Sequence, residues 1–374
     1  MNLEEHVAKP LLAAAGIAVP AGLVVTDAAA AAAAARRLGP CVVKAQVAAG
    51  GRGKAGGIRP ATTAAEAAAA AEAILGMTIG GQPVERLLVE QRIEAKRELY
   101  AAVLTDAASK GPLILVAAEG GVEVEELAEG DPEALLRIPV DIRHGIDAAA
   151  LAPRLAPLDL DDFRSDLTEV LARLYGVWAS SDAELVEINP LALTTDGRLI
   201  ALDCKLALDD AAAARRPELA ARATPELRTP LEAQALEHGL RFIELSGNVG
   251  VLANGAGLTM TTMDAIAHYG GAPANFLEIG GEAYRLGRPA LEVVLANPRV
   301  ASLVVNFCGA FARTDVMTGG IIEAWQALSP RIPAFFSIHG TGADEAIEMV
   351  RTRLGLEPFE SMDDAVQAAV AAAR

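Results

Sequence analysis

The chain up to about residue 230 mixes short apolar runs with helical patterns. Alanines after Asp27 are followed by Arg36, Arg37 and a Gly-Pro pair, which predicts a helix with an acidic N-cap, a basic last turn and a defined end. The apolar run at 41–47 predicts a strand that enters a loop at 50–57, because that segment holds too many glycines for a helix or a strand. Further strands are predicted at 87–90, 98–104, 113–117, 185–194 and 199–206.

Beyond residue 231 the pattern becomes a regular alternation of strands and helices. Several apolar runs each lead into a helical stretch, as is typical of a parallel α/β sheet. These runs are 249–253, 274–279, 303–307 and 334–338. We therefore expect an α/β protein with two domains, residues 1–230 and residues 231–374, joined through the less periodic stretch at 209–230.

Composition and charge exclude several classes of protein. Hydrophobic residues make up 52% of the 374 residues, but many are alanine, and no apolar run approaches the roughly 18 to 20 residues that span a membrane. The net charge of −17 disfavours nucleic acid and anionic membranes as partners, so an anionic ligand needs a focused site. The segment Met1–Glu5 lacks the basic and apolar regions of an export signal, so we expect a cytoplasmic protein.

The positions of cysteine and histidine argue against two common kinds of site. Cys41, Cys204 and Cys308 form no CxxC or Cys/His spacing, so we expect each to be a small core residue rather than a disulfide partner or a zinc ligand. None of the five histidines stands beside a recognisable nucleophile or in HExxH spacing. We therefore expect no catalytic histidine in this chain.

A basic, glycine-rich segment follows the first buried strand. Lys44 lies near the end of that strand, and Gly51, Arg52, Gly53 and Lys54 come directly after it. Glycine lets a backbone approach a ligand closely, and free amides together with positive side chains bind phosphate oxygens. The GxxxxGK[ST] pattern of a Walker loop does not occur. The segment therefore predicts a polyphosphate site, with a mobile surface loop as the alternative.

A second polar group lies on two strands that Asp196-Gly197 predicts to form a hairpin. Alternation along a strand places Glu187 and Asn189 on one face, and the hairpin can bring Asp203 beside them. Such oxygen ligands suit Mg²⁺, which binds one or two carboxylates while it shares phosphate oxygens of a substrate. The alternative is a polar edge hairpin that holds no metal.

Two further carboxylates, Glu90 and Glu98, flank the connection between two predicted strands. Either is placed to contact an adenine amino group, a ribose hydroxyl or a neighbouring lysine, and the alternative for each is a solvated surface carboxylate. The acidic run at 119–129 is expected to be exposed.

These segments, in this order, resemble the β subunits of succinyl-CoA synthetases. The resemblance covers nearly the whole chain, and the ordered set of segments makes it specific. The matching segments are 1–5, 16–20, 43–57, 88–90, 98–100, 119–123, 187–191, 254–258 and 273–277. The resemblance implies an α+β ATP-grasp module followed by a flavodoxin-like, parallel α/β ligase domain.

For the first domain the resemblance implies a nucleotide site with its metal. The residues that would hold ATP or GTP are Lys44, the backbone from Gly51 through Arg52 to Gly53, Glu90, Ile93 and Glu98. The Mg²⁺ ligands would be Asn189 and Asp203, and Glu187 would face a phosphorylated histidine. The metal and Lys44 would offset the charge that builds on the transferring phosphate.

In this family the phosphorylated histidine belongs to a separate, CoA-binding α subunit. That subunit passes the phosphoryl group to succinate, and succinyl phosphate then gives succinyl-CoA in the tricarboxylic acid cycle. The resemblance thus accounts for a chain without a catalytic histidine of its own. The residues that would help to hold the acid at the subunit interface are Asn254, Gly309, Ala310, Phe311 and Ala312.

The chain departs from the family pattern mainly in the second domain. Where the family has Gly-Gly-Ile, this chain has Gly309-Ala310-Phe311, and Ser337 stands where an arginine is usual. These departures keep open a paralogue that acts on malate or another small carboxylate, and a noncatalytic nucleotide-binding subunit. ATP against GTP preference and αβ against α₂β₂ assembly also stay open.

Overall fold

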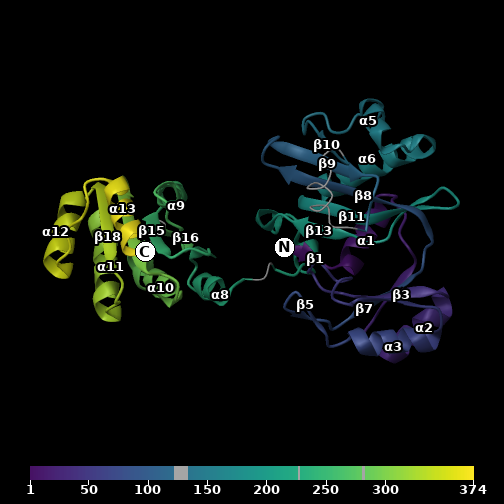
Figure 1. Cartoon of the computed structure of the whole chain (residues 1–374), viewed down its shortest axis with the longest axis horizontal. Coiled ribbons are helices and arrows are strands. Elements are labelled where there is room, and N and C mark those ends of the chain that lie inside the picture. The colour runs from purple at the N-terminus through teal and green to yellow at the C-terminus, as the bar shows by residue number, and fades with distance from the viewer. Residues whose placement is uncertain (122–133, 226–227, 280–282) are drawn as a thin grey trace. The chain divides into compact units, whose positions relative to one another are not determined.

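The computed structural model describes residues 1–121, 134–225, 228–279 and 283–374 (Figure 1). The chain divides into two compact units, Met1–Glu226 and Leu227–Arg374, and each is described by itself. Most of the acidic run predicted to be exposed at 119–129 lies outside the described residues. None of the helices in the described ranges combines the length and the apolar character that a bilayer-spanning segment requires.

The first unit combines helices with antiparallel sheets. Its helices are α1 (Glu5–Ala14), α2 (Ala28–Leu38), α3 (Ala64–Ile74), α5 (Ala148–Arg154), α6 (Arg164–Ser180) and α7 (Pro217–Ala220). Its strands are β1 (Asn2–Leu3), β2 (Gly22–Val25), β3 (Cys41–Ala45), β4 (Ile58–Ala61), β5 (Thr78–Ile79), β6 (Gln82–Pro83), β7 (Leu87–Gln91), β8 (Ala95–Asp106), β9 (Gly111–Ala117), β10 (Leu135–Pro139), β11 (Ala183–Thr194), β12 (Leu199–Ala201) and β13 (Lys205–Leu208).

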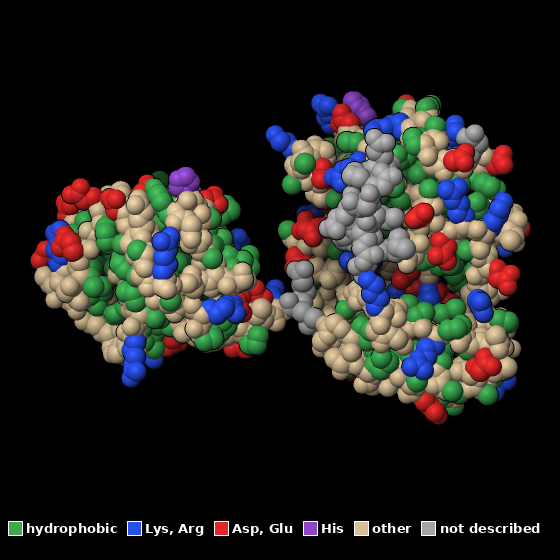
Figure 2. Space-filling model, in the orientation of Figure 1, with side chains coloured by type: hydrophobic (Ala, Val, Ile, Leu, Met, Phe, Trp, Pro, Cys, Tyr) green, Lys and Arg blue, Asp and Glu red, His purple; other side chains and the backbone are tan. Residues whose placement is uncertain are grey.

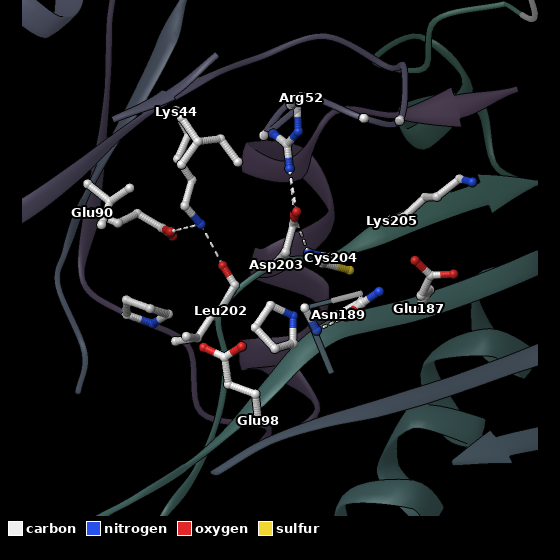
Figure 3. Close-up of a pocket in the computed structure, with 18 of the residues that line it drawn as sticks. Lys44, Arg52, Glu90, Glu98, Glu187, Asn189, Leu202, Asp203, Cys204 and Lys205 are labelled. Atoms are coloured by element: carbon white, nitrogen blue, oxygen red, sulfur yellow. Dashed lines mark hydrogen bonds and ion pairs between the residues drawn. The ribbon is translucent and has the colours of Figure 1, made fainter. Parts of the chain in front are cut away.

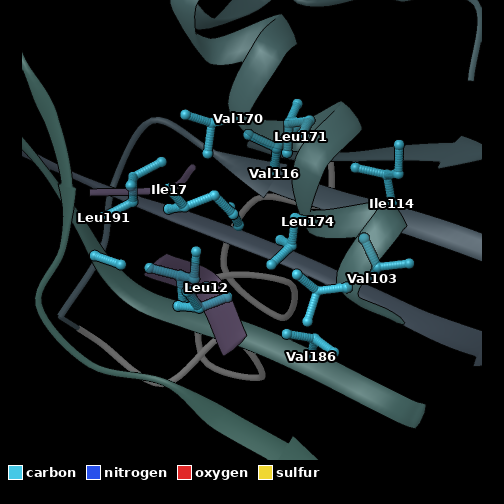
Figure 4. Close-up of a cluster of buried hydrophobic side chains, with 14 of the residues drawn as sticks. Leu12, Ile17, Val103, Ile114, Val116, Val170, Leu171, Leu174, Val186 and Leu191 are labelled. Atoms are coloured by element: carbon cyan, nitrogen blue, oxygen red, sulfur yellow. The ribbon is translucent and has the colours of Figure 1, made fainter. Parts of the chain in front are cut away.

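The larger sheet of this unit has seven strands, in the order β1-β13-β11-β8-β9-β10, with β12 paired to β11. Helix α6 covers one face of it, because Leu167, Leu171 and Leu174 recur at the spacing that places them on one side of a helix. They pack against strand residues such as Val103 and Val186, all of them fully buried (Figure 4). Complete burial of a leucine stabilises a fold by about 1.5–3 kcal/mol, so this cluster anchors the sheet.

A smaller sheet of four strands, in the order β2-β7-β3-β4, is covered by α2 and α3. The two helices pack against each other through small side chains, among them Ala31 and Ala67, which have no solvent exposure. The predicted N-cap is present, since the Asp27 carboxylate accepts a hydrogen bond from the Ala30 amide at 2.7 Å. The alanine-rich stretch therefore forms a helix whose buried face is nearly all methyl groups.

The predicted strand at 199–206 is not continuous, and that prediction is wrong. β12 pairs with residues 191–193 of β11 and β13 pairs with residues 183–187, so the segment 202–204 lies outside the ladder. The pairing of β11 shifts register between Ile188 and Leu191, and Pro190 within this shift has no amide hydrogen to donate to a partner strand. The interruption takes Asp203 out of the sheet and leaves its side chain free to turn toward other elements.

The second unit is a parallel sheet with helices on both faces. Its strands are β14 (Arg241–Glu244), β15 (Val249–Asn254), β16 (Asn275–Ile279), β17 (Ser302–Gly309) and β18 (Ala334–Gly340), in the order β14-β16-β15-β17-β18, with β14 alone antiparallel among these strands. Its helices are α8 (Pro230–Glu237), α9 (Ala256–His268), α10 (Ala283–Ala296), α11 (Thr314–Leu328), α12 (Ala343–Leu354) and α13 (Met362–Ala372).

Alternating strand residues of this sheet enter two separate cores. Leu303 and Val305 pack with α10 and α11, whereas Val249 and Val304 pack with α9 and α13. A sheet buried on both faces by crossover helices is what the strand–helix alternation of the sequence predicts. The expected fold class, an α+β module followed by a parallel α/β domain, is therefore confirmed.

Cys41 and Cys204 are buried as predicted, and burial raises the pKa of both thiols. Cys308 is exposed, so the prediction of a core residue is wrong there. It lies next to the last residue of β17, where the strand leaves the cover of the helices.

Candidate functional site

A cavity of about 1170 Å³ in the first unit is lined by residues of both sheets and of the loop at 50–57. It contains the residues that the sequence predicted for a polyphosphate and for its metal. These are Lys44, Gly51, Arg52, Gly53, Glu90, Ile93, Glu98, Glu187, Asn189 and Asp203. Figure 3 shows how the side chains labelled there converge from strands and from the segments between strands. The fold therefore brings together in one space residues that lie up to 159 positions apart, from Lys44 to Asp203.

Lys44 projects from β3 into this cavity and is almost fully buried. Its Nζ lies 2.8 Å from a carboxylate oxygen of Glu5 and 2.8 Å from one of Glu90, and it donates to the Leu202 carbonyl at 2.5 Å. Burial alone would lower the pKa of Lys44, but the nearby carboxylates, Glu5 foremost, raise it above its ordinary value. Lys44 is therefore positively charged at neutral pH.

Glu5, in the first turn of α1, is the central anion beneath the cavity. One of its oxygens accepts from Lys44 at 2.8 Å and lies 2.7 Å from the Lys9 Nζ, and the other accepts from Arg52 at 2.8 Å. Burial would raise the pKa of Glu5, but the positive charges around it, Lys44 first, hold the pKa well below its usual range. Glu5 is thus a buried carboxylate that stays ionised because cations surround it.

Arg52 joins this group of charges to the hairpin. Its Nη1 donates to Glu5 at 2.8 Å and to the Ala45 carbonyl at 2.9 Å, and its Nη2 donates to both carboxylate oxygens of Asp203 at 2.6 and 2.7 Å. The loop that carries Arg52 packs closely at Gly57, where a Cβ would lie 2.6 Å from the Ile79 side chain and 3.1 Å from the Ala45 Cβ. Gly57 then donates to the Arg52 carbonyl at 2.9 Å and holds the loop closed.

Glu187 and Asn189 lie on β11 beside Asp203, as Figure 3 shows. The Tyr100 hydroxyl donates to Glu187 at 3.2 Å, and the Gly121 amide donates to the Asn189 side-chain oxygen at 2.6 Å. In the part of the chain that the structure describes, no three His, Cys, Asp or Glu side chains gather in a way that could hold a metal. A metal here would use the carboxylate of Asp203 and the amide oxygen of Asn189.

The remaining residues of the predicted nucleotide site differ in their surroundings. Glu90 is 3% exposed, and its carboxylate is engaged by Lys9 and Lys44. Glu98 on β8 is exposed at the cavity, and Ile93 lies in the connection between β7 and β8. The carboxylate of Glu90 is therefore held by these two lysines, whereas Glu98 can offer its carboxylate to a ligand.

Sequence reasoning missed Glu5 and Lys9. Both lie on the buried face of α1, with Ala8 and Leu12 beside them at helical spacing. A Glu and a Lys four positions apart are usually a solvated surface pair. The signal that could have identified them is that this pair falls within the apolar stripe of the helix.

The predicted acid-binding residues lie in the second unit, where β15 and β17 end. The Asn254 side chain donates to the Cys308 carbonyl at 2.9 Å and accepts from the Cys308 amide at 2.8 Å, so it joins the ends of the two strands. Gly309 ends β17, Ala310, Phe311 and Ala312 form the turn that follows it, and the Phe311 side chain is fully exposed. The structure therefore gathers these residues at the carboxyl end of the sheet, where parallel sheets bind ligands.

On the face of the molecule visible in Figure 2, acidic and basic side chains are interspersed rather than separated by sign. The concentration of buried cations at the cavity thus differs from the general surface of a chain with a net charge of −17. Lys44 and Arg52 are each paired with carboxylates there, so an anion that binds at the cavity has to share these cations with Glu5, Glu90 and Asp203.

Comparison with known proteins agrees with this arrangement. The ATP-grasp domain family matches residues 2–193, and the CoA-ligase family matches residues 252–372. The chain is 42% identical over 379 residues to the succinate–CoA ligase [ADP-forming] subunit beta of Chloroflexus aurantiacus, with 100% of this chain and 99% of that protein covered. It is 41% identical over 376 residues to the same subunit of Halorubrum lacusprofundi, with 99% and 98% covered.

Among solved structures, ATP citrate lyase from Methanothrix soehngenii, in complex with citrate and coenzyme A, has the same fold. It matches with a TM-score of 0.65 and 23% identity, and 99% of each chain is covered. The two domain matches, the order of the two units and the full-length similarity agree. The chain belongs to the family of succinate–CoA ligase [ADP-forming] β subunits.

Proposed function

We propose that this chain is the nucleotide-binding subunit of a succinate–CoA ligase, which converts ATP, succinate and CoA into ADP, phosphate and succinyl-CoA. The observation that carries the proposal is the cavity of the first unit, where Lys44 and Arg52 stand beside Asn189 and Asp203. The named relatives support the same assignment.

Lys44 and Arg52 are the groups that would bind the phosphates of the nucleotide. In phosphoryl transfer the protein contributes mainly position and positive charge, because charge spreads over the oxygens of the transferring group. Both side chains line the cavity and are held in place by Glu5. The glycines at 51 and 53 leave the backbone amides of the loop accessible to phosphate oxygens.

The donor set at Asn189 and Asp203 fits Mg²⁺, which prefers oxygen ligands and tolerates a site with only one or two protein carboxylates. Arg52 already pairs with both oxygens of Asp203, so this carboxylate is built to face a positive charge. Mg²⁺ bound there would offset the negative charge of the phosphate oxygens. Asn189 and Asp203 would hold the Mg²⁺, and Lys44 would hold the phosphates of the nucleotide next to the metal.

Glu187 would act on the partner subunit. We propose that the phosphoryl group passes to a histidine of a CoA-binding α subunit and then to succinate, and that Glu187 faces this histidine. The Glu187 carboxylate lies at the cavity and accepts a hydrogen bond from Tyr100. This hydrogen bond would hold the carboxylate in place to orient the imidazole of the partner histidine.

For the acid, we propose that Asn254 and the turn from Gly309 to Ala312 contribute to the succinate site. Malate or another small carboxylate is a second candidate because the turn Gly309-Ala310-Phe311 departs from the family pattern. The curated relatives support succinate. A noncatalytic role is disfavoured because Lys44, Glu187 and Asp203 all lie at one cavity.

The test is to purify the chain with an α subunit from the same genome and to incubate the complex with [γ-³²P]ATP. We expect a labelled histidine on the α subunit, which succinate and CoA discharge and malate does not. Lys44→Met should abolish labelling, whereas Lys110→Met, which changes an exposed lysine, should not. If malate discharged the label and succinate did not, malate would be the substrate. Absence of label would contradict the proposal.

A further inference from the structure

Lys9 and Lys44 contact the same three groups, Glu5, Glu90 and the Leu202 carbonyl. Lys9 lies 2.7 Å from Glu5, donates to both oxygens of Glu90 at 2.7 and 2.6 Å, and donates to the Leu202 carbonyl at 2.8 Å. The Nζ of Lys44 reaches Glu5, Glu90 and the Leu202 carbonyl at 2.8, 2.8 and 2.5 Å. Glu5 and Glu90 therefore each contact two ammonium groups, and each carboxylate keeps one of them when the other lysine turns away.

The two lysines differ in their access to the cavity. Lys44 lines the cavity, whereas Lys9 is not among the described residues that line it. Lys9 comes from α1, beneath the cavity, and its side chain is 5% exposed against 10% for Lys44. A phosphate that enters the cavity can therefore reach Lys44, while Lys9 stays with the carboxylates.

The charges of this buried network balance in the structure. Its described members are Glu5, Glu90 and Asp203 as anions and Lys9, Lys44 and Arg52 as cations. When Lys44 turns toward a phosphate, Glu5 and Glu90 lose one of their cations. An unpaired buried carboxylate is costly, so another cation must remain to keep both carboxylates ionised.

We propose that Lys9 is a positioning residue that neutralises Glu5 and Glu90 and thereby frees Lys44 for the phosphates of the nucleotide. This inference rests on the proposed function, because it assigns a role within the same nucleotide site. Without Lys9, the ammonium of Lys44 is needed by both carboxylates. Nucleotide binding then has to break the ion pairs of Lys44 with Glu5 and Glu90, and no second lysine replaces them.

The experiment measures the Kd for ATP by calorimetry on the complex with the α subunit, well below the unfolding temperature of each variant. Lys9→Met is expected to raise the Kd by about tenfold or more, because a buried charge pair is broken in the bound state. Lys9→Arg keeps the charge and is expected to stay within about threefold of the wild type. An equal, tenfold loss in Lys9→Arg would overturn the proposal, even if Lys9→Met does not fold.

A double-mutant cycle separates this role from general damage to the fold. In the Glu90→Gln background Glu5 is the one carboxylate left to Lys9, and Glu5 also pairs with Arg52, so Lys9→Met is expected to change the Kd by less than about threefold. The same tenfold loss in both backgrounds would show that Lys9 acts in another way. If the wild type itself binds no ATP, the proposed function fails; if it binds and Lys9→Met binds equally well, only the role of Lys9 fails.

Discussion

The Arg52 guanidinium and the Asp203 carboxylate form an ion pair. Nη2 of Arg52 lies 2.6 and 2.7 Å from the two carboxylate oxygens. Asp203 also accepts from the Cys204 amide at 2.7 Å, so its orientation is set from two sides. Arg52 therefore forms its ion pair with the same carboxylate that we propose as a Mg²⁺ ligand. A divalent cation and this guanidinium compete for the same oxygens.

The first prediction follows from that competition. Arg52→Gln should tighten the binding of Mn²⁺ to the nucleotide-free protein, by about tenfold, because the competing charge is removed. Binding is measured by electron paramagnetic resonance of free Mn²⁺. Asp203→Asn is the control and should weaken Mn²⁺ binding whether or not Arg52 is present. Equal Mn²⁺ affinity in the wild type and Arg52→Gln would mean that the ion pair does not compete with the metal.

The second prediction separates the chemical role of Asp203 from a structural one. Asp203→Ala should lower phosphoryl transfer to the α subunit by at least about a hundredfold, because a charged group at the phosphates is lost. The side chain of Asp203 is 29% exposed and lies outside the strand ladder, so the melting temperature should fall by only a few degrees. Single-turnover labelling and a thermal melt measure the two effects. Unchanged Mg²⁺-dependent turnover would remove Asp203 from the site.

Local patterns predicted the elements and much of the cavity lining. Apolar runs identified β3 and β11, and the unusual density of glycine and basic residues identified the loop of Arg52. The charged group beneath the cavity was not predictable, since Glu5 meets its partners only after folding: Lys44 is 39 positions away and Arg52 is 47. The break between β12 and β13 was missed because it depends on the register shift of the neighbouring strand.

The third prediction concerns pH and the stability of the first unit. Glu5→Gln leaves the buried cations under-compensated and should reduce the free energy of unfolding by about 3–5 kcal/mol at neutral pH. The pKa of Glu5 is lowered in the folded state, so the unfolded chain takes up the proton first as the pH falls. The stability that Glu5 contributes is therefore fully present above about pH 4.3 and is lost below it.

Urea unfolding at a series of pH values checks this third prediction. The difference between the wild type and Glu5→Gln should shrink as the pH drops below about 4. Glu72→Gln is a suitable control, because Glu72 is an exposed carboxylate on α3. A difference that stays constant down to pH 2 would contradict an ionised, stabilising Glu5.

The fourth prediction concerns the hydroxyl of Tyr100, which is 2% exposed and donates to Glu187 at 3.2 Å. Tyr100→Phe removes this donor and should slow phosphorylation of the partner histidine by about three- to tenfold, the value of one hydrogen bond. The Kd for ATP should not change, because the hydroxyl contacts the proposed transfer residue rather than the phosphate-binding lysine. Tyr175→Phe, on α6, is the matched control. A change in Kd without a change in rate would contradict this role of Tyr100.

The fifth prediction concerns acid selection by Phe311. Its ring is fully exposed, so Phe311→Ser should change the free energy of unfolding by no more than about 0.5 kcal/mol. If the ring faces the bound acid, it offers the hydroxyl of malate no hydrogen-bond partner, and a serine offers one. Discharge of the phosphorylated complex by malate should therefore rise severalfold relative to discharge by succinate.

The control for Phe311→Ser is Ile243→Ser, which changes another exposed apolar residue of the same unit, on the edge strand β14. Both variants replace an exposed apolar side chain with serine, so a general effect of surface polarity would act on both. Only Phe311→Ser is expected to alter the ratio of malate to succinate discharge. The same ratio in the wild type and in both variants would mean that the phenyl ring does not face the acid, and selection would then have to come from other groups at the carboxyl end of the sheet.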